Sequence, residues 1–168
     1  MTKLPPLLPE EILQRVLRLA RTDGLSVLLI AGLLALVAAS AGDYTGAIIG
    51  LLIAGAGAVE LHGESLIRHG YPRGMNWLVG SQIYLMLVVF VYCAVRLVHV
   101  AIPSIPDNLM PVLELNAQQW KMTVPEFLLT FYRLSIGLLA FLTFFYQGGM
   151  AIYYFRRREV VAQALAQD

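Results

Sequence analysis

Residues 25–60 read LSVLLIAGLLALVAASAGDYTGAIIGLLIAGAGAVE, and this stretch decides the fold. Its first apolar run, 25–41, reaches the short end of the roughly 17–25 residues that a helix needs to cross the hydrocarbon layer of a bilayer. A tight Gly-Asp-Tyr turn follows, in which Asp43 can cap the next helix. The second predicted span covers 44–62. The stretch therefore predicts a hairpin of two membrane-spanning helices.

Small residues give this hairpin a packing surface. In the second run they recur every four positions, at Gly46, Gly50, Ala54 and Ala58. The first run offers a matching series, Ala31, Ala35 and Ala39. Residues four apart share one face of a helix, and small side chains let two helix backbones approach closely in a membrane. We therefore expect the two helices to pack tightly along these ridges.

The composition of the whole chain agrees with a membrane protein. Of its 168 residues, 58% are hydrophobic and 14% are charged, whereas soluble domains carry roughly 25% charged residues. A soluble fold of this size could not bury so much apolar surface, because small domains have a high surface-to-volume ratio. The net charge of +1 gives no reason to expect a nucleic-acid partner. Cys93 is the single cysteine, and we expect no cofactor and no metal.

Two further apolar runs complete the set of spans. The third span is predicted over 76–102 and is stopped by Pro103. The motif Thr-Val-Pro-Glu at 123–126 matches a capping box with proline in the first helical turn, which indicates a helix start. The fourth span is predicted over 123–155 and is longer than one crossing requires, so we expect it to tilt or to project from the bilayer.

Three segments lie outside the predicted spans. Residues 9–22 place apolar side chains opposite an Arg-rich side, as in helices that lie flat on anionic lipid headgroups. Gly24 then permits a sharp change of direction. Residues 103–122 form an outer loop with a short interfacial helix anchored by Trp120. Residues 156–168 form a tail.

The basic residues orient the chain. With four crossings, the N-terminal segment, the loop between the second and third spans and the tail lie on the same side of the membrane. These segments hold nine basic residues: Lys3, Arg15, Arg18, Arg21, Arg68, Arg73, Arg156, Arg157 and Arg158. The opposite face receives one, Lys121. The positive-inside rule then places both termini in the cytoplasm of a bacterial-type inner (plasma) membrane. The predicted fold is an all-α integral membrane protein of one domain, 1–168, in which an up-down-up-down four-helix transmembrane bundle follows an N-terminal amphipathic interfacial helix.

Two arginines lie within the predicted spans. Arg96 is near the outer end of the third span, with His99 beside it, and Arg133 enters the fourth span from the same side. One interpretation is an outward-facing basic site for an anion or a lipid headgroup, formed by Arg96, His99 and Arg133. The other is structural, with the arginines extending to headgroups or pairing with nearby acids. The candidate acids are Asp43, Asp107, Glu114 and Glu126.

A second polar group is predicted at the cytoplasmic ends of the spans. Its members are Glu60, His62, Glu64, Gln82 and Gln147. Carboxylates and imidazoles together can bind a divalent cation or relay protons. The alternative is a solvated helix end in which Glu64 pairs with Arg68, four residues on. Glu60 is the strongest candidate for function, because it directly follows an apolar run.

Polar stripes on the third and fourth spans suggest a path through the membrane. The stripes are Ser81, Tyr84, Tyr92 and His99 on the third, and Tyr132, Thr143, Gln147 and Tyr154 on the fourth. The leading hypothesis is therefore a small channel- or transporter-like protein. A non-catalytic subunit or scaffold of a larger membrane complex is the alternative, and an enzyme is disfavoured because no nucleophile–base pair is visible. Expected partners are the lipid bilayer, anionic headgroups, and further copies of the chain or other membrane subunits.

Overall fold

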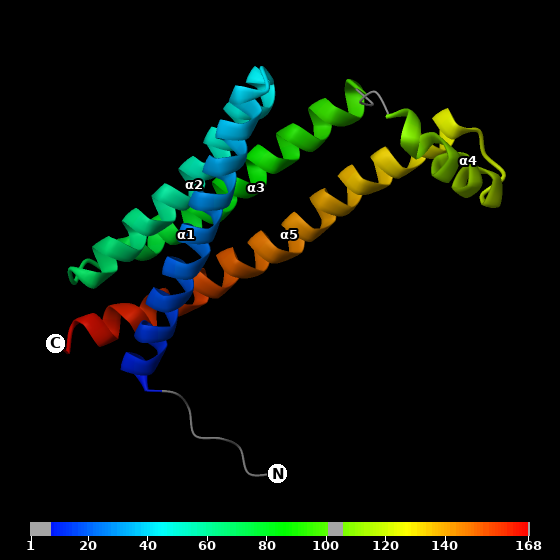
Figure 1. The fold of residues 1–168 in the computed structure, drawn as a ribbon. Coiled ribbons are helices and arrows are strands. Elements are labelled where there is room, and N and C mark those ends of the chain that lie inside the picture. Colours follow the sequence, from blue (N-terminus) through cyan, green and yellow to red (C-terminus); the bar gives the residue numbers. More distant parts are fainter. Residues whose placement is uncertain (1–7, 101–105, 168) are drawn as a thin grey trace, which may run out of the picture.

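The computed structural model describes residues 8–100 and 106–167, and every regular element in that part of the chain is helical (Figure 1). The elements are α1 (Pro9–Ser40), α2 (Tyr44–Arg68), α3 (Gly74–Val98), a 3-10 turn (Asp107–Leu109), α4 (Met110–Gln119) and α5 (Val124–Leu165). Four of these helices, α1, α2, α3 and α5, are long and apolar enough to cross a membrane. The predicted all-helical fold with four candidate spans is confirmed. The predicted end of the third span, at residue 102, lies outside the described residues, as does Lys3.

Two helix starts form as the sequence predicts. The Asp43 side chain accepts a hydrogen bond from the Gly46 backbone N–H at 2.9 Å, which satisfies a free donor in the first turn of α2. Gly42 before it has a φ of 76°, a left-handed conformation that suits glycine. At α5, the Thr123 N–H donates to the Glu126 carboxylate at 3.0 Å. The predicted cap and capping box are both confirmed.

The hairpin of α1 and α2 contains the most extensive helix contact in the protein. A Cβ atom added to Gly50 would lie 2.8 Å from the Cβ of Ala35. Nearer the other end, a Cβ on Gly57 would lie 2.6 Å from the carbonyl oxygen of Gly24. Ala58 is exposed, because the contact passes from Ala54 to Gly57 as the helices cross. The small-residue interface thus exists, but at its end Gly57 makes the contact that was predicted for Ala58.

The N-terminal segment is not separated from the first span. α1 runs without a break through Gly24, so the change of direction expected there is wrong. Gly24 instead allows a close approach, since an added Cβ would lie 3.1 Å from the Gly57 carbonyl oxygen. The apolar side of 9–22 is buried against other helices instead of facing lipid. The tail predicted over 156–168 is likewise helical as far as Leu165.

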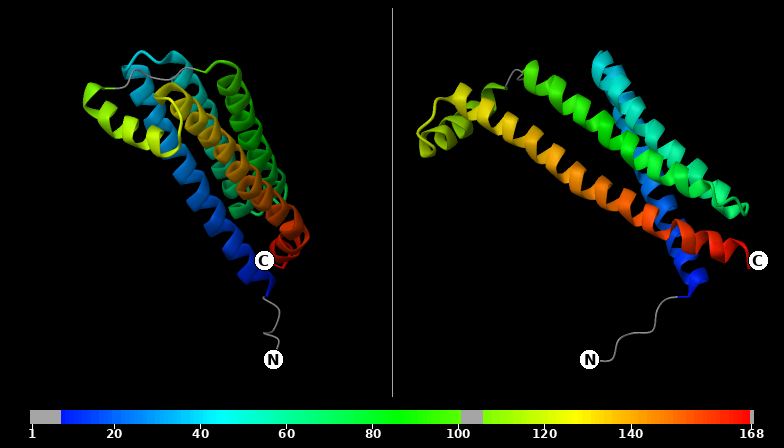
Figure 2. Two further views of the ribbon diagram at one scale, coloured as in Figure 1. Left: turned by 90° about the vertical axis from the view of Figure 1, so that its right-hand side faces the viewer. Right: turned by 180° about the vertical axis from the view of Figure 1, so that it is seen from behind.

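Two apolar cores hold the helices together. The first, here called the basic-end core, joins the start of α1, the α2–α3 turn and the end of α5 through Ile12, Leu13, Val16, Leu17, Ala20, Ile67, Met75, Leu78, Tyr154, Val161 and Ala164. The second, the mid-span core, consists of Ala56, Leu85, Val89, Cys93 and Ile136. Beyond it the α1–α2 hairpin diverges from α3 and α5 (Figures 1 and 2). The best-packed part of the molecule is therefore the end at which α1 begins and α5 finishes.

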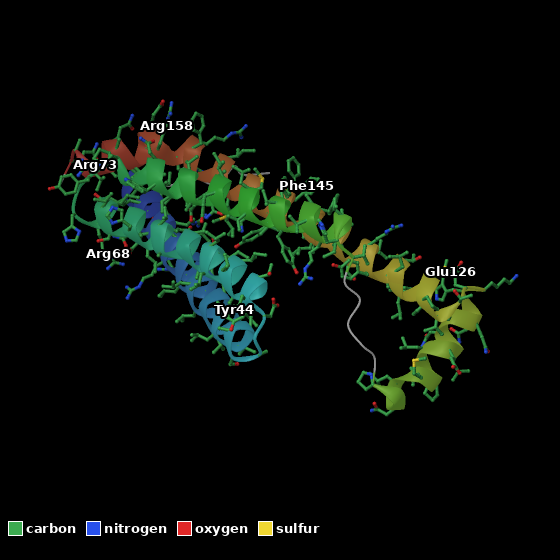
Figure 3. All side chains as sticks on the ribbon, turned by 90° about the horizontal axis from the view of Figure 1, so that it is seen from above. Tyr44, Arg68, Arg73, Glu126, Phe145 and Arg158 are labelled. Atoms are coloured by element: carbon green, nitrogen blue, oxygen red, sulfur yellow. The ribbon has the colours of Figure 1, made fainter. Side chains whose placement is uncertain are left out.

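The charged side chains are distributed between the ends of the molecule as the basic count suggests. Arg68, Arg73 and Arg158 lie at one end, and Glu126 lies near the other (Figure 3). α5 has 42 residues, which is about 63 Å at a rise of 1.5 Å per residue, against a hydrocarbon layer of about 30 Å. Because α5 exceeds that thickness, part of it must lie beyond the hydrocarbon layer or run obliquely through it.

Candidate functional site

Glu60 carries a buried carboxylate. It lies on α2 directly after the apolar run and is 2% exposed. Its Oε1 accepts a hydrogen bond from the hydroxyl of Tyr154 on α5 at 2.8 Å. Asp23 and Gln82 are its other polar neighbours. An acidic side chain is rarely buried without a partner, because loss of hydration disfavours the charge.

Asp23 brings a second carboxylate to the same place from α1. It is half-buried, and its Oδ1 accepts a hydrogen bond from the Tyr146 hydroxyl at 2.9 Å. Its Oδ2 accepts a longer one, 3.4 Å, from the Nε2 of Gln82 on α3. Because Tyr146 is itself exposed, Asp23 and Tyr146 form the rim of the group and Glu60 its interior.

Two buried glutamines leave oxygens unpaired. Gln82 is 1% exposed and Gln147 is 8% exposed. The Oε1 atom of each has no hydrogen-bond partner within the described part of the chain. A buried amide oxygen without a partner costs about 1–3 kcal/mol, so a further hydrogen-bond donor or cation at these atoms would stabilise the protein.

We call this group the acidic network: Asp23, Glu60, Gln82, Tyr146 and Tyr154, with Gln147 added because it is buried next to Tyr146 on α5. Each of the four long helices contributes to it. Among the described residues, ion pairs occur between Glu64 and Arg68 and between Arg158 and Glu159, and neither involves the network. The network therefore holds two carboxylates and two free amide oxygens with no cationic side chain to balance them.

Apolar layers enclose the network on two sides. On one side, Ala56 precedes Glu60 by one helical turn and Leu85 follows Gln82 by about one turn, and both belong to the mid-span core. On the other side, Ala20 precedes Asp23 by one turn and lies in the basic-end core. Tyr154 belongs to that core as well. Asp23 on α1 and Tyr146 on α5 are therefore the most exposed members of the network.

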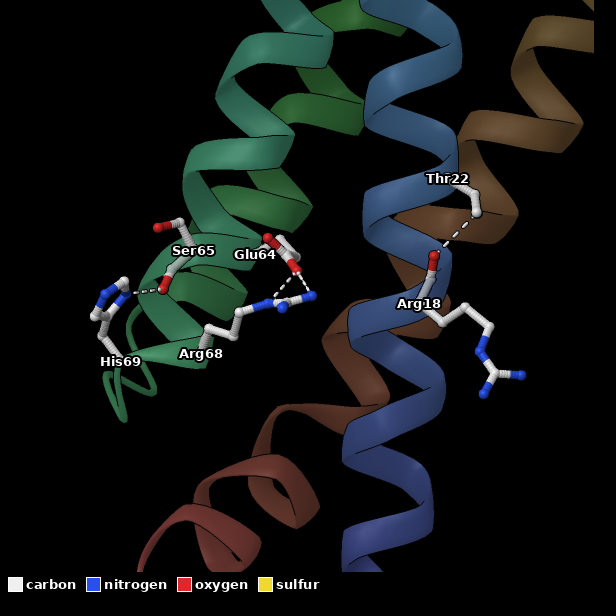
Figure 4. A network of polar contacts seen from close by, with 6 residues as sticks. All are labelled: Arg18, Thr22, Glu64, Ser65, Arg68 and His69. Carbon is white, nitrogen blue, oxygen red and sulfur yellow. Dashed lines mark hydrogen bonds and ion pairs between the residues drawn. The ribbon is translucent and has the colours of Figure 1, made fainter.

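Of the five residues predicted to cluster at the cytoplasmic ends of the spans, Glu60 and Gln82 are neighbours, and Gln147 is buried on α5. Glu64 is buried but pairs with Arg68 on its own helix, at 2.6 Å between oxygen and guanidinium nitrogen (Figure 4). His62 is exposed and meets the edge of the Trp77 ring, 5.1 Å between centroids. His62 and Glu64 therefore have separate partners, Trp77 and Arg68, and do not join Glu60 in a group of carboxylates and imidazoles.

Asp23 is the residue that the sequence reasoning missed. The expected helix break at Gly24 removed Asp23 from the bundle, although it continues the spacing of Val16 and Ala20, which are seven and three residues before it. A helix uninterrupted through this point would have placed Asp23 beside the buried face. That spacing was the available signal.

Arg96, His99 and Arg133 form no ion pair or side-chain hydrogen bond with one another among the described residues. The Arg96 guanidinium lies over the ring of Tyr92 on its own helix, 5.4 Å from the centroid. Arg133 and His99 are exposed. Neither arginine forms an ion pair in the part of the chain that the structure describes. A shared anion site for Arg96, His99 and Arg133 stays a prediction.

The polar stripes of the third and fourth spans do not form a continuous path. Ser81 donates to the carbonyl of Leu78 on its own helix at 2.8 Å, and the Tyr132 hydroxyl reaches the Arg96 carbonyl at 3.4 Å. Between this outer contact and the acidic network, α3 and α5 meet through the mid-span core. Polar side chains are therefore concentrated in the network.

The chemistry of the site must be argued from its own residues. No known family model matches the chain, and neither the curated proteins nor the solved structures provide a significant match. No group of three or more His, Cys, Asp or Glu side chains within the described ranges is arranged to hold a metal ion. What the network does offer is an excess of oxygen acceptors in a low-dielectric setting.

Proposed function

We propose that this protein is a small multi-pass transporter of the bacterial-type inner membrane and that the acidic network binds its substrate, a small cation. One observation carries the proposal: four candidate spans meet at two carboxylates that form no ion pair with any residue that the structure describes. Ionisable residues inside a membrane bundle are costly, and they mark ion or substrate pathways. An acceptor-rich, negatively charged site attracts a cation.

The proposed topology is up-down-up-down with both termini in the cytoplasm. It is supported by nine basic residues against one, and by the position of Arg68, Arg73 and Arg158 at one end of the molecule (Figure 3). In this orientation the basic-end core is cytoplasmic. The acidic network then lies toward the inner boundary of the hydrocarbon layer, with Asp23 at its rim.

A carrier fits this arrangement better than an open channel. A channel requires a continuous polar path, whereas the mid-span core closes the network from the outer side. In transporters a site enclosed by packed helices opens to one side at a time as helix pairs move against each other. The diverging α1–α2 hairpin and α3–α5 pair are the natural moving parts (Figure 2).

The test is a flux measurement in proteoliposomes. Purified protein is reconstituted, and uptake of Na⁺, K⁺ and H⁺ is followed with fluorescent indicators. We expect uptake of a cation by the wild type and its loss in Glu60→Gln. The matched control is Glu64→Gln, which alters a buried carboxylate outside the network and should retain flux. Wild-type vesicles as tight as empty ones, or equal flux in both variants, would contradict the proposal.

A second candidate is a subunit or scaffold of a larger assembly, including a homo-oligomer. The favouring observation is extensive apolar exposure on the diverging helices. An apolar groove of about 500 Å³ lies between α2 and α3, lined by residues that include Ile49, Leu52, Tyr84, Leu87 and Val91. Lipid or another helix would cover it. A different protein that copurifies in fixed ratio in mild detergent would favour this candidate over the transporter.

A further inference from the structure

We propose that the acidic network binds one dehydrated monovalent metal cation of the Na⁺ type. Its ligands would be carboxylate oxygens of Asp23 and Glu60 and the amide oxygens of Gln82 and Gln147. This inference rests on the proposed function, since it names the cation class for the same site. It is tested by binding alone, so that it can fail or succeed separately from transport.

The carboxyl groups of Asp23 and Glu60 lie together without a cationic partner among the described residues. Asp23 and Glu60 come from different helices and are neighbours, and no ion pair to either exists among the described residues. Tyrosine hydroxyls donate to both carboxylates, but a hydroxyl dipole does not neutralise a charge. Buried carboxylates are normally paired or bind a cation. The missing positive charge can come from a proton shared by the two carboxyl groups or from a bound metal cation.

The amide oxygens of Gln82 and Gln147 are buried and have no hydrogen-bond partner among the described residues. Gln82 is turned toward the carboxylates, because its Nε2 donates to Asp23 at 3.4 Å, yet its Oε1 has no partner. Its side chain is almost completely buried, with 1% exposed. A single proton on one carboxyl group could satisfy only one acceptor at a time. A metal cation can contact several oxygens at once.

Gln147 joins this set through its position on α5. It precedes Tyr154 by seven residues, which is two helical turns, so both lie on one face of α5. Helical side chains lean toward the N-terminus of their helix, which directs the Tyr154 ring toward the level of Gln147. The Tyr154 hydroxyl reaches Glu60 at 2.8 Å. Gln147, with its unpartnered Oε1, therefore lies on the face of α5 that carries Tyr154.

The ligand set selects a monovalent cation. Zinc and similar metals prefer His and Cys ligands. Among the described residues, no three His, Cys, Asp or Glu side chains are grouped so that they could hold such an ion. Ca²⁺ requires about 6–8 oxygens, and Mg²⁺ requires near-octahedral geometry and keeps several waters. The four proposed ligands carry six carboxylate and amide oxygens, of which three already accept hydrogen bonds from Gln82, Tyr146 and Tyr154. Desolvation also costs a divalent ion more, because the Born energy rises with the square of the charge.

The experiment measures thermal unfolding of the full-length protein in detergent at constant ionic strength, with choline chloride replaced stepwise by NaCl. A ligand that binds the folded state raises Tm progressively with its concentration. We expect a saturable rise in Tm for the wild type, and equilibrium binding of radioactive Na⁺ at one ion per chain. Glu60→Gln should abolish the rise, and Glu64→Gln should preserve it.

Gln147→Met provides a variant that should fold even if Glu60→Gln does not, because Gln147 makes no side-chain hydrogen bond among those described and methionine has a similar size. We expect it to shift the Na⁺ midpoint upward by tenfold or more without lowering Tm in choline. A wild-type Tm that does not respond to Na⁺, responds equally to choline, or responds only to Ca²⁺ would overturn the site. Na⁺ binding without flux would instead retain the site and reject the transport function.

Discussion

The hydroxyl of Tyr154 donates to the Oε1 of Glu60 at 2.8 Å, across 94 residues of sequence. Both side chains are almost fully buried. The bond joins the C-terminal part of α5 to α2 at the boundary between the basic-end core and the acidic network. Because the bond connects helix packing with the candidate site, a change to either residue should alter the free energy of unfolding.

Removing that hydroxyl should destabilise the protein. Tyr154→Phe keeps the ring in the basic-end core but leaves a buried Glu60 oxygen without its donor, which costs about 1–3 kcal/mol. Thermal unfolding in detergent measures the loss. Tyr153→Phe is the matched control, since no hydrogen bond of the Tyr153 hydroxyl occurs in the described part of the chain. Equal Tm values for the two variants would mean that the bond contributes nothing measurable.

Glycines on α2 should respond in opposite ways to one added methyl group. Gly57→Ala places a Cβ 2.6 Å from the Gly24 carbonyl oxygen, and we expect a loss of about 1–3 kcal/mol as the hairpin is forced apart. Gly55→Ala meets nothing within 4 Å and should be neutral or stabilising by up to about 1 kcal/mol, because alanine favours helix. Unfolding curves of the two variants decide; a destabilised Gly55→Ala with an unaffected Gly57→Ala would reverse the assignment of faces.

The start of α1 should behave as part of a protein core. Val16 is 0% exposed in the basic-end core, so Val16→Asp should destabilise the fold by about 3 kcal/mol or more through burial of an unpaired charge. Gln14→Asp introduces the same charge on the exposed side and should change stability little. If residues 9–22 lay on lipid instead, both variants would leave the melting of the bundle unchanged and only weaken membrane association.

The proposed orientation can be read by cysteine labelling in intact cells. Cys93 is first replaced by alanine, and single cysteines are placed at the exposed positions Gln118 on α4 and Gln163 on α5. A membrane-impermeant maleimide should label position 118 and leave position 163 unlabelled until the cells are opened. Labelling of 163 in intact cells would show that the basic end faces outward.

Helix type, number and several ends were predictable from the sequence because they depend on local properties. An apolar run of sufficient length is a candidate span whatever surrounds it. Asp43 and the Thr123–Glu126 pair cap their helices through contacts between residues three apart. Glu60 could also be singled out from the sequence, because an acid directly after an apolar run is costly wherever the helix packs.

The membership of the acidic network was decided by tertiary structure. Asp23 meets Gln82 and Tyr146 across 59 and 123 residues of sequence, and these contacts require α1 to continue through Gly24. Continuity there depends on Gly57 of another helix, which packs against Gly24 and offsets the low helix propensity of glycine. The same packing covers the apolar face of 9–22 with protein, which sequence periodicity cannot distinguish from lipid. Periodicity identifies the buried face of a helix; the rotation and crossing of neighbouring helices determine what that face meets.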